Sequence, residues 1–196
     1  PLPFYYEPLE AQATDRVKYP LSAITQRPMA MYHSWDSQNA WLRQIHNQNA
    51  LYVNPAVARA QGIEDGGWMW VESQWGKVRC MCSYSEAVEP GTVWTWNAIG
   101  KAPGAWNLAP DANESQRGFL LNHLITDELP GAGGARISNS DPITGQAAWY
   151  DVRVRILPAG ADEPKTTWPQ FDAVPAAPGT ATTRPRWLAY FAGGNH

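Results

Sequence analysis

The stretch from residue 51 to residue 96 alternates short apolar runs with turn-forming residues, and this spacing strongly constrains the fold. "WMWVESQ" and "KVRCMCSY" flank the pair "WG" and predict a β-hairpin. The second strand would point four side chains to one face: Val78, Cys80, Cys82 and Tyr84. "EPG" then turns the chain into another strand, "TVWTW". Short strands joined in this way indicate a β-barrel with inserted helices rather than alternating β-α-β units.

Two short helices are predicted in the connections between strands. The run "NPAVARAQG" predicts one, because Asn54 can cap it, Pro55 suits its first position and Gly62 can end it. A second helix is predicted in "DSQNAWLRQIHNQ", whose first residue, Asp36, is available as its cap. In that run a tryptophan and an isoleucine are four positions apart, as on one face of a helix.

Further strands are predicted in "VKYPLSAIT" (17–25), "LYV" (51–53) and "AWYDVRVRI" (148–156). The last of these alternates apolar with charged residues over Tyr150 to Ile156. Between them, "SQRGFLLNHLITDEL" (115–129) predicts a helical turn or more, followed by a flexible "PGAGGAR". The glycines of that connection lack the spacing of a nucleotide-binding loop.

At 196 residues the chain has the length of one domain with extended ends. Residues 1–16 contain several prolines and follow neither the helix nor the strand period, so we expect an extended segment. Residues 17–157 hold the predicted barrel, and residues 158–196 form a tail rich in Pro and Ala.

The charge pattern argues against nucleic acid and anionic membrane as partners, because the net charge is −3 and acidic and basic residues are interspersed. No run reaches the roughly 18 apolar residues that a membrane-spanning helix needs. We therefore expect no membrane insertion by this chain and a cytoplasmic location.

Cysteine and histidine do not point to a metal site or to a catalytic residue in this chain. Cys80 and Cys82, the only two cysteines, are interpreted as small buried hydrophobic residues. The four histidines are scattered, and none has a second ligand at a spacing typical of metal sites. We also find no nucleophile motif.

What remains is a set of polar loops with little charge, at 25–39, 97–107 and 122–146. If these loops converge, Arg27 could bind a phosphate, Thr25 and Ser34 its other oxygens, and Asn or Gln amides the edge of a heterocycle. Such a set suits a large cofactor that is neutral to anionic. Each residue alone also has a structural explanation, such as a surface ion pair for Arg27.

The ordered series "YPLSAITQR", "LYVNPAVARAQGIEDGGWMWVESQWGKV", "VEPGTVW", "LLNHLITDEL" and "SDPITGQAAWYDVRVRI" resembles the C-terminal molybdopterin-dinucleotide-binding domain of the dimethyl sulfoxide reductase family. The resemblance covers roughly residues 17 to 157. It implies a mainly β fold, a six-stranded double-psi β-barrel with short helices and extended N- and C-terminal segments.

The resemblance also implies a cofactor and partners. In such enzymes this domain closes over a bis(molybdopterin guanine dinucleotide), whose molybdenum or tungsten is carried mainly by other domains. An iron–sulfur cluster is expected only in the rest of the enzyme. The implied partners are the remaining domains of the catalytic subunit, together with an iron–sulfur electron-transfer subunit. This chain would be part of an oxidoreductase without being catalytically competent alone.

The resemblance assigns cofactor contacts residue by residue and assigns no metal ligand. "TQR" occupies the family's first cofactor-binding turn, and further contacts follow in the same loop and in later ones. Asn122 matches the Asn of the family's "N-x-L-T" element, which here reads "NHLI". The implied contacts are Thr25, Gln26, Arg27, His33, Ser34, Asn122, Asp141 and Gln146.

Two functional hypotheses follow. The long "WTWNAIGKAPGAWN" loop is similar to that of the polysulfide and thiosulfate reductase and sulfite dehydrogenase branch, which favours redox chemistry of sulfur compounds. The alternative is a stand-alone carbohydrate-binding module, motivated by eleven Trp against four Phe. Against the alternative, several indoles fall on predicted strands, where we expect core packing.

Overall fold

Six strands close into a barrel in the computed structural model, which describes residues 5, 7–33, 35, 39–97, 99, 118–147, 152–161 and 170–171. The strands are β1 (Leu21–Gln26), β2 (Ala50–Val53), β3 (Trp68–Glu72), β4 (Gly76–Tyr84), β5 (Thr92–Trp96) and β8 (Arg153–Pro158). They pair in the order β2-β5-β1-β8-β3-β4, and a further β2–β4 pairing closes the ring. The mainly β fold with a closed six-stranded barrel is therefore confirmed.

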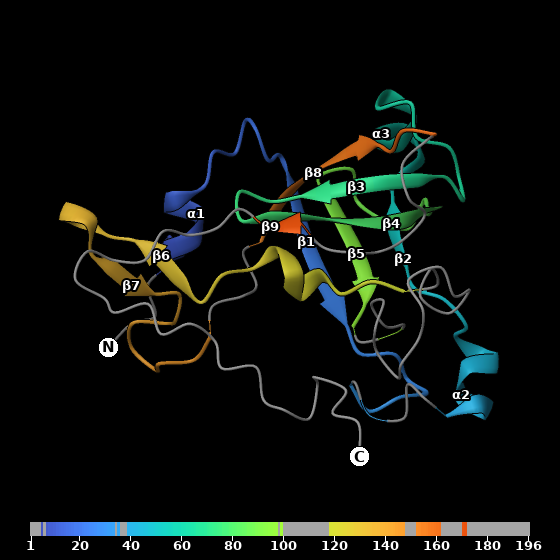
Figure 1. Cartoon of the computed structure of the whole chain (residues 1–196), viewed down its shortest axis with the longest axis horizontal. Helices are drawn as coiled ribbons and strands as arrows, with labels where there is room; N and C mark the ends of the chain where they lie inside the picture. The colour runs from blue at the N-terminus through green and yellow to red at the C-terminus, as the bar shows by residue number, and fades with distance from the viewer. Residues whose placement is uncertain are drawn as a thin grey trace, which may run out of the picture.

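Two of the strand pairs are parallel, and they orient the barrel. β1 runs parallel to β5 with Gln26 opposite Trp96, and β2 runs parallel to β4. The other pairs of the ring, β2–β5, β1–β8, β3–β8 and β3–β4, are antiparallel. Because β1 and β5 are parallel, their carboxyl ends lie side by side at the same edge of the barrel (Figure 1). The loops that leave these two strands therefore begin as neighbours.

Alternation along the strands separates the core from the outer surface. On β3, Met69 and Val71 are fully buried, whereas Trp68 and Trp70 are half-buried and face outward. On β5, Trp94 faces outward and stacks on Tyr52 with ring centroids 4.2 Å apart. The expectation that the strand indoles pack in the core is therefore wrong, because the strand period gives the inward positions to smaller side chains.

The predicted hairpin is confirmed as β3 and β4. Val78, Cys80 and Cys82 all point into the core and are buried. Tyr84 is half-buried at the end of the same face, and its hydroxyl donates to the carbonyl of Ile63 at 2.6 Å. The last barrel strand, β8, likewise buries alternate residues, while the predicted members Tyr150 and Asp151 lie outside the described residues.

Of the two predicted helices, α3 (Pro55–Ala60) is confirmed: the side chain of Asn54 accepts from the amide of Ala56 at 3.0 Å. Gly62 follows with φ +69°, a conformation that glycine adopts without strain. The helix α2 (Ala40–Ile45) also forms, but Asp36 is not its cap. Asn39 accepts from the backbone amide of Trp41 at 2.9 Å, so the cap and the start of the helix lie three residues later than predicted.

Several elements lie outside the barrel. They are the helix α1 (Leu9–Ala13), the strands β6 (Glu128–Pro130), β7 (Arg136–Ser138) and β9 (Gln170–Phe171), and the 3-10 turns η3 (Leu121–Leu124) and η4 (Ala132–Gly134). Residues 9–13 of the predicted extended segment thus form a helix. The glycine run 131–134 is not a loose connection but the turn between β6 and β7, with Gly133 and Gly134 at positive φ. Within the described ranges, no helix has the length and hydrophobicity needed to cross a membrane.

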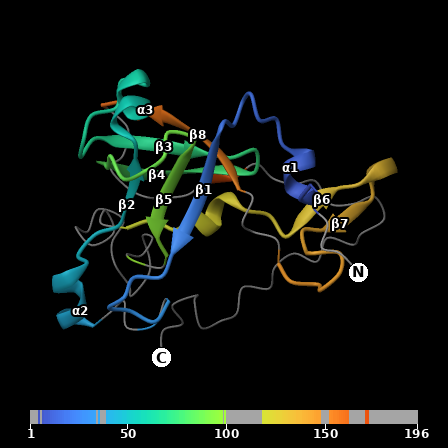
Figure 2. The same ribbon diagram turned by 180° about the vertical axis from the view of Figure 1, so that it is seen from behind.

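A buried carboxylate attaches α1 to the rest of the molecule. Glu10 is 1% exposed. One of its oxygens accepts from the indole of Trp75 at 3.0 Å, and the other accepts from the amide of Asn139 at 2.9 Å. Trp75 lies in the β3–β4 turn and Asn139 follows β7, so one side chain joins three segments that lie side by side (Figure 2).

We predict that Glu10→Ala lowers the free energy of unfolding by about 3 kcal/mol, because the buried amide of Asn139 and the half-buried indole of Trp75 both lose their acceptor. Urea unfolding followed by tryptophan fluorescence measures the change. Glu7→Ala is the matched control: Glu7 forms an ion pair with Arg16 at the surface, so its loss should cost less than about 1 kcal/mol. Equal losses in the two variants would contradict the attachment role of Glu10.

Candidate functional site

The candidate site lies where β1 and β5 end. We call it the β1–β5 end and define it as residues 25–33 and 96–97. On β1, Leu21 and Ala23 are buried, but Thr25 is exposed although the strand period points it inward. Its partner in register, Thr95, is fully buried. The Thr25 side chain is therefore accessible at the end of β1, and Gln26 and Arg27 follow it as exposed residues.

Arg27 is the only charged residue between residues 21 and 33. One nitrogen of its guanidinium donates to the carbonyl of Met31 at 3.0 Å and lies 3.5 Å from that of Pro28. These contacts fold the loop back onto its own side chain. In the described part of the chain no other group bonds to this guanidinium, so its remaining N–H groups can bind an anion.

His33 has φ +52°, the only non-glycine residue with positive φ among those described. This conformation costs a residue with a Cβ atom of the order of 1 kcal/mol. The imidazole is exposed and stands edge-on to the ring of Tyr32, with centroids 5.2 Å apart. Ser34, the next predicted contact, lies outside the described residues.

Asn97 joins the ends of the two strands. Its backbone amide donates to the carbonyl of Gln26 at 2.8 Å and so continues the β1–β5 pairing by one residue. The side-chain oxygen of Asn97 is buried and has no hydrogen-bond partner among the residues that the structure describes. A buried acceptor without a donor carries a free-energy cost, and a bound N–H group would remove it.

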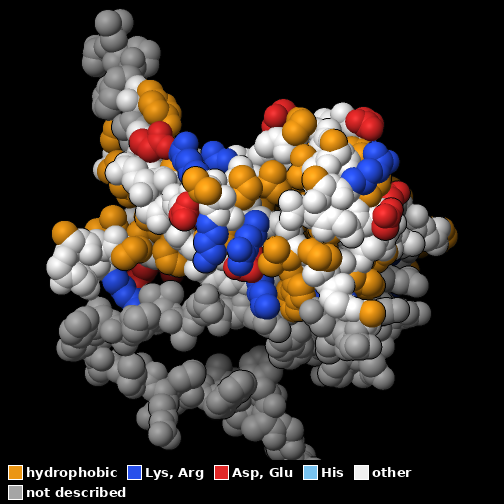
Figure 3. Space-filling model, turned by 90° about the horizontal axis from the view of Figure 1, so that it is seen from above, with side chains coloured by type: hydrophobic (Ala, Val, Ile, Leu, Met, Phe, Trp, Pro, Cys, Tyr) orange, Lys and Arg blue, Asp and Glu red, His pale blue; other side chains and the backbone are white. Residues whose placement is uncertain are grey.

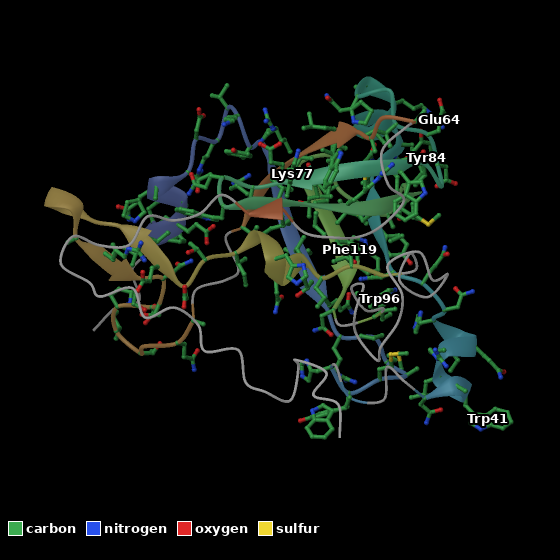
Figure 4. All side chains as sticks on the ribbon, in the orientation of Figure 1. Trp41, Glu64, Lys77, Tyr84, Trp96 and Phe119 are labelled. Carbon is green, nitrogen blue, oxygen red and sulfur yellow. The ribbon has the colours of Figure 1, made fainter. Side chains whose placement is uncertain are left out.

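Asn122 belongs to a different segment that reaches the same edge. The carbonyl of Phe119 lies 3.2 Å from the side-chain nitrogen of Asn49, which also donates to the carbonyl of Trp96 at 2.9 Å. Figure 4 shows Phe119 and Trp96 near the end of β5. Asn122 itself is exposed on η3. Burial lowers the pKa of its neighbour His123, which favours a neutral imidazole.

Asp141 and Gln146 lie apart from this group. The loop that holds them follows β7, away from the β1–β5 end in both Figure 1 and Figure 2. The carboxylate of Asp141 accepts from the amides of Ile143 and Thr144 at 3.0 Å and 2.6 Å, so it closes its own turn. Gln146 is exposed on the same loop.

The described residues offer neither a metal site nor an activated thiol. They contain no group of three or more His, Cys, Asp or Glu side chains that could hold a metal ion. Burial raises the pKa of the Cys80 thiol well above its usual value. Burial, followed by the negative charge of Asp65, raises the pKa of Cys82 to about 12. Both thiols are therefore protonated at neutral pH.

The face opposite the β1–β5 end carries Lys and Arg side chains among hydrophobic ones (Figure 3). Two arginines of β8 are engaged in folding contacts. Arg155 pairs with Glu72 at 2.7 Å, and Arg153 donates to the carbonyl of Pro20 at 3.1 Å. Both side chains thus support the barrel, and the Glu72 carboxylate offsets the charge of Arg155.

Large hydrophobic side chains are exposed next to the β1–β5 end. Met29 is 95% exposed, and Trp41 on α2 is 78% exposed and points away from the barrel (Figure 4). The other exposed members are Ile24, Tyr32, Trp35 and Ile45. We call these six residues the apolar margin. Contiguous exposed hydrophobic surface is typical of contacts with another protein part.

The β1–β5 end thus combines one cation, an unsatisfied amide oxygen and exposed hydroxyl and amide groups. Such a set can bind an anionic group through Arg27 and a heterocycle with N–H groups through Asn97. It contains no carboxylate that would repel a phosphate among the described residues 21–33. Sequence reasoning named the 97–107 loop but not Asn97 itself, because only the structure shows which amide is left without a partner.

Comparison with known proteins identifies relatives. Residues 21–137 match the family model described as "Molydopterin dinucleotide binding domain". The chain is 66% identical over 194 residues to a sulfite dehydrogenase subunit of Allochromatium vinosum, covering 98% of this chain and 20% of that protein. It is 32% identical over 143 residues to the dopamine dehydroxylase of Eggerthella lenta, covering 69% of this chain and 14% of that protein.

A solved structure shares the fold. The acetylene hydratase from Pelobacter acetylenicus superposes with a TM-score of 0.55 at 20% identity, over 81% of this chain and 21% of that one. The chain thus spans about a fifth of the length of the sulfite dehydrogenase relative and of the acetylene hydratase.

We predict that neither thiol reacts rapidly with iodoacetamide in the folded protein. With its pKa raised to about 12, Cys82 is a thiolate in only about one molecule in ten thousand at pH 8. Mass spectrometry of the peptide that contains Cys80 and Cys82 measures the alkylation, and unfolding in urea should make both cysteines reactive.

The same shift predicts an alkaline loss of stability. The folded state holds the Cys82 proton more tightly than the unfolded state, whose pKa is near the ordinary 9.0, so stability should decrease as the pH rises from about 9 toward 12.

In the alkylation experiment, rapid reaction of either cysteine in the folded protein at pH 8 would contradict the assignment of both as buried neutral residues.

Proposed function

The chain belongs to the family of molydopterin dinucleotide binding domains, and from this premise we propose that it covers a bis(molybdopterin guanine dinucleotide) in the catalytic subunit of an oxidoreductase that acts on a sulfur compound. Family membership gives the coarser statement, a molybdopterin cofactor. The bis form, the choice of molybdenum or tungsten and the substrate are parts of the proposal.

One observation supports the placement of this cofactor more than any other. The buried side-chain oxygen of Asn97 lacks a donor in the described part of the chain, and the backbone amide of the same residue bonds to Gln26, which precedes Arg27. Pterin and guanine rings carry N–H groups, and the dinucleotide carries phosphates. The two kinds of group that the ligand presents therefore match the two kinds of group that the β1–β5 end leaves unused.

Each proposed contact has a role that its chemistry allows. The free N–H groups of Arg27 bind a phosphate, while its bonds to the 28–31 carbonyls keep the guanidinium in place. Thr25 and Gln26 offer a hydroxyl and an amide from the open end of the barrel. Asn122 offers a second exposed amide from η3. These groups bind and orient the ligand, and they carry out no chemical step.

His33, Ser34, Asp141 and Gln146 complete the proposed set inferred from the resemblance. His33 is exposed in the Arg27 loop. The turn-closing bonds of Asp141 favour a positioning role, in which the carboxylate shapes the loop that presents Gln146. When bound, the molybdenum or tungsten of the cofactor supplies the redox chemistry.

We propose that the remaining domains of the catalytic subunit cover the apolar margin. The chain spans about a fifth of its sulfite dehydrogenase relative, so most of such a protein lies outside the residues described here. The apolar margin includes residues of the Arg27 loop and of α2. In this proposal, the other domains bind the face of the cofactor that this chain leaves open. An iron–sulfur cluster and an iron–sulfur electron-transfer subunit complete the proposed enzyme.

Sulfite is the proposed substrate, supported by the 66% identity to a sulfite dehydrogenase subunit. The full-length protein that carries this chain should oxidise sulfite with an artificial electron acceptor. Thiosulfate and polysulfide, tested as reducible substrates with a reduced dye, are the comparison. Turnover of either compound in place of sulfite would contradict the proposed substrate and favour thiosulfate or polysulfide reduction instead. A cytoplasmic location is part of the same proposal, and cell fractionation tests it.

The carbohydrate-binding alternative finds little support in the outer indoles. Sugar stacking needs a free aromatic face, but Trp94 stacks on Tyr52, and the Lys77 ammonium lies 4.7 Å above the ring of Trp70. One face of each of these rings is therefore already covered. Family membership points to a different ligand.

We predict that Arg27→Ala in the full-length protein lowers the guanine and metal content per protein several-fold, since a charge-assisted phosphate bond is worth about 1.5–3 kcal/mol. Guanine is measured by chromatography after acid release, and the metal by mass spectrometry. Arg59→Ala is the matched control, because Arg59 is exposed on α3 at the other end of the barrel and packs on Tyr84. Unchanged guanine and metal content in the Arg27 variant would refute the role of this residue.

A further inference from the structure

Asn49 is a buried amide that the cofactor assignment does not use. It is 2% exposed and precedes β2 directly. Its side-chain nitrogen donates to the carbonyls of Trp96 and Phe119, at 2.9 Å and 3.2 Å. Its side-chain oxygen accepts from the hydroxyl of Thr95 at 3.0 Å. Every polar atom of this side chain is thus bonded, and the need to donate to two carbonyls fixes the orientation of the amide.

The two carbonyls that Asn49 binds belong to segments far apart in the sequence. Trp96 is the last residue of β5, and Phe119 precedes η3, which carries Asn122. Between them lies the long predicted loop, most of which is outside the described residues. Asn49 therefore ties together the two described ends of that stretch. The backbone amide of Asn97, the residue after Trp96, then bonds to Gln26 on β1.

Thr95 extends this arrangement into the barrel wall. Its side chain is fully buried, and its hydroxyl oxygen lies 3.0 Å from the carbonyl of Ala50 as well as from Asn49. The hydroxyl carries one proton, so it donates to one of these two oxygens at a time, and both oxygens belong to residues at the start of β2. A buried hydroxyl between two such acceptors has few alternative positions, so it limits movement between the segments that it joins.

We propose that Asn49, supported by Thr95, is a positioning residue that sets the relative placement of the Gln26–Arg27 loop and the Asn122 segment for the cofactor. The inference rests on the proposed function. Asn49 itself does not touch the ligand in this proposal. It acts by holding two ligand-binding segments at one edge of the barrel, and losing its donors lets them separate without opening the core.

The test compares two buried asparagines in the full-length protein. Asn49→Asp keeps the oxygen that accepts from Thr95 but replaces both donors to Trp96 and Phe119. Asn54→Asp is the matched control, because Asn54 is also buried and loses one donor, to the carbonyl of Val88 at 3.0 Å. Aspartate retains the capping oxygen of α3, which lies at the end of the barrel away from the β1–β5 end (Figure 1).

In Asn49→Asp we expect about a tenfold increase in amide hydrogen exchange over 96–99 and 118–125, with guanine content per protein falling several-fold. In Asn54→Asp we expect a fall in melting temperature comparable to that of Asn49→Asp, but guanine content should stay at the wild-type level. Guanine retained in Asn49→Asp, or lost equally in both variants, would overturn the positioning role. Absence of guanine from the wild-type protein would instead refute the proposed function.

A second pair keeps the test decisive if Asn49→Asp does not fold. Thr95→Val preserves the shape of the side chain but removes the hydroxyl, whereas Thr95→Ser retains it. The inference expects the valine variant to lose guanine and the serine variant to restore it to near the wild-type content. Equal guanine content in these two variants would overturn it, since the hydroxyl would then have no part in holding the site.

Discussion

Closure of the barrel depends on β2, a strand of only four residues that pairs on both sides. It runs parallel to β4 over its whole length and antiparallel to β5 at Tyr52 and Val53. Without these pairings the remaining strands would form an open sheet with two exposed edges, and such edges are prone to aggregation. Leu51 and Val53 are fully buried, so the same short strand also fills the core.

The β1–β5 end is one edge of this closed barrel. Parallel pairing of β1 with β5 brings their carboxyl ends together at that edge, where backbone groups are no longer used by a neighbouring strand. Polar residues can then face a ligand without breaking the ladder. A site made in this way binds through many directed hydrogen bonds and a single cation. It therefore suits a large dinucleotide better than a small, highly charged ion.

Sequence rules that use only neighbouring residues predicted the α3 helix and the β3–β4 hairpin. The α3 helix has its cap and its terminating glycine in adjacent positions, and the β3–β4 hairpin has two alternating strands around one turn, so both follow from neighbouring residues. The α2 cap was assigned to Asp36 because several capping residues compete in that run, and sequence alone does not show that Asn39 reaches an amide. The outward position of the indoles was missed because strand period shows alternation but not which face is the core.

The contacts that join distant segments could not be predicted in this way. Glu10 meets Asn139 across more than half of the chain, and Asn49 meets Phe119 across a long connection. Such pairs depend on the closed ring, which no short window of sequence contains. For the candidate site, the resemblance supplied Thr25 to Arg27 as a group, and the structure added the bonds that hold Arg27 and the unpaired oxygen of Asn97.

The position of Asn49 links the fold to the ligand. It stands one residue before the strand that closes the ring. Its side-chain nitrogen donates to one backbone carbonyl in each of the two proposed ligand-binding segments, those of Trp96 and Phe119. A ligand that binds both segments favours their joined arrangement, because binding to one state stabilises that state. In this proposal, cofactor binding and the joined arrangement of the two segments are two parts of one equilibrium, and this coupling requires no conformational change larger than the loss of a few hydrogen bonds.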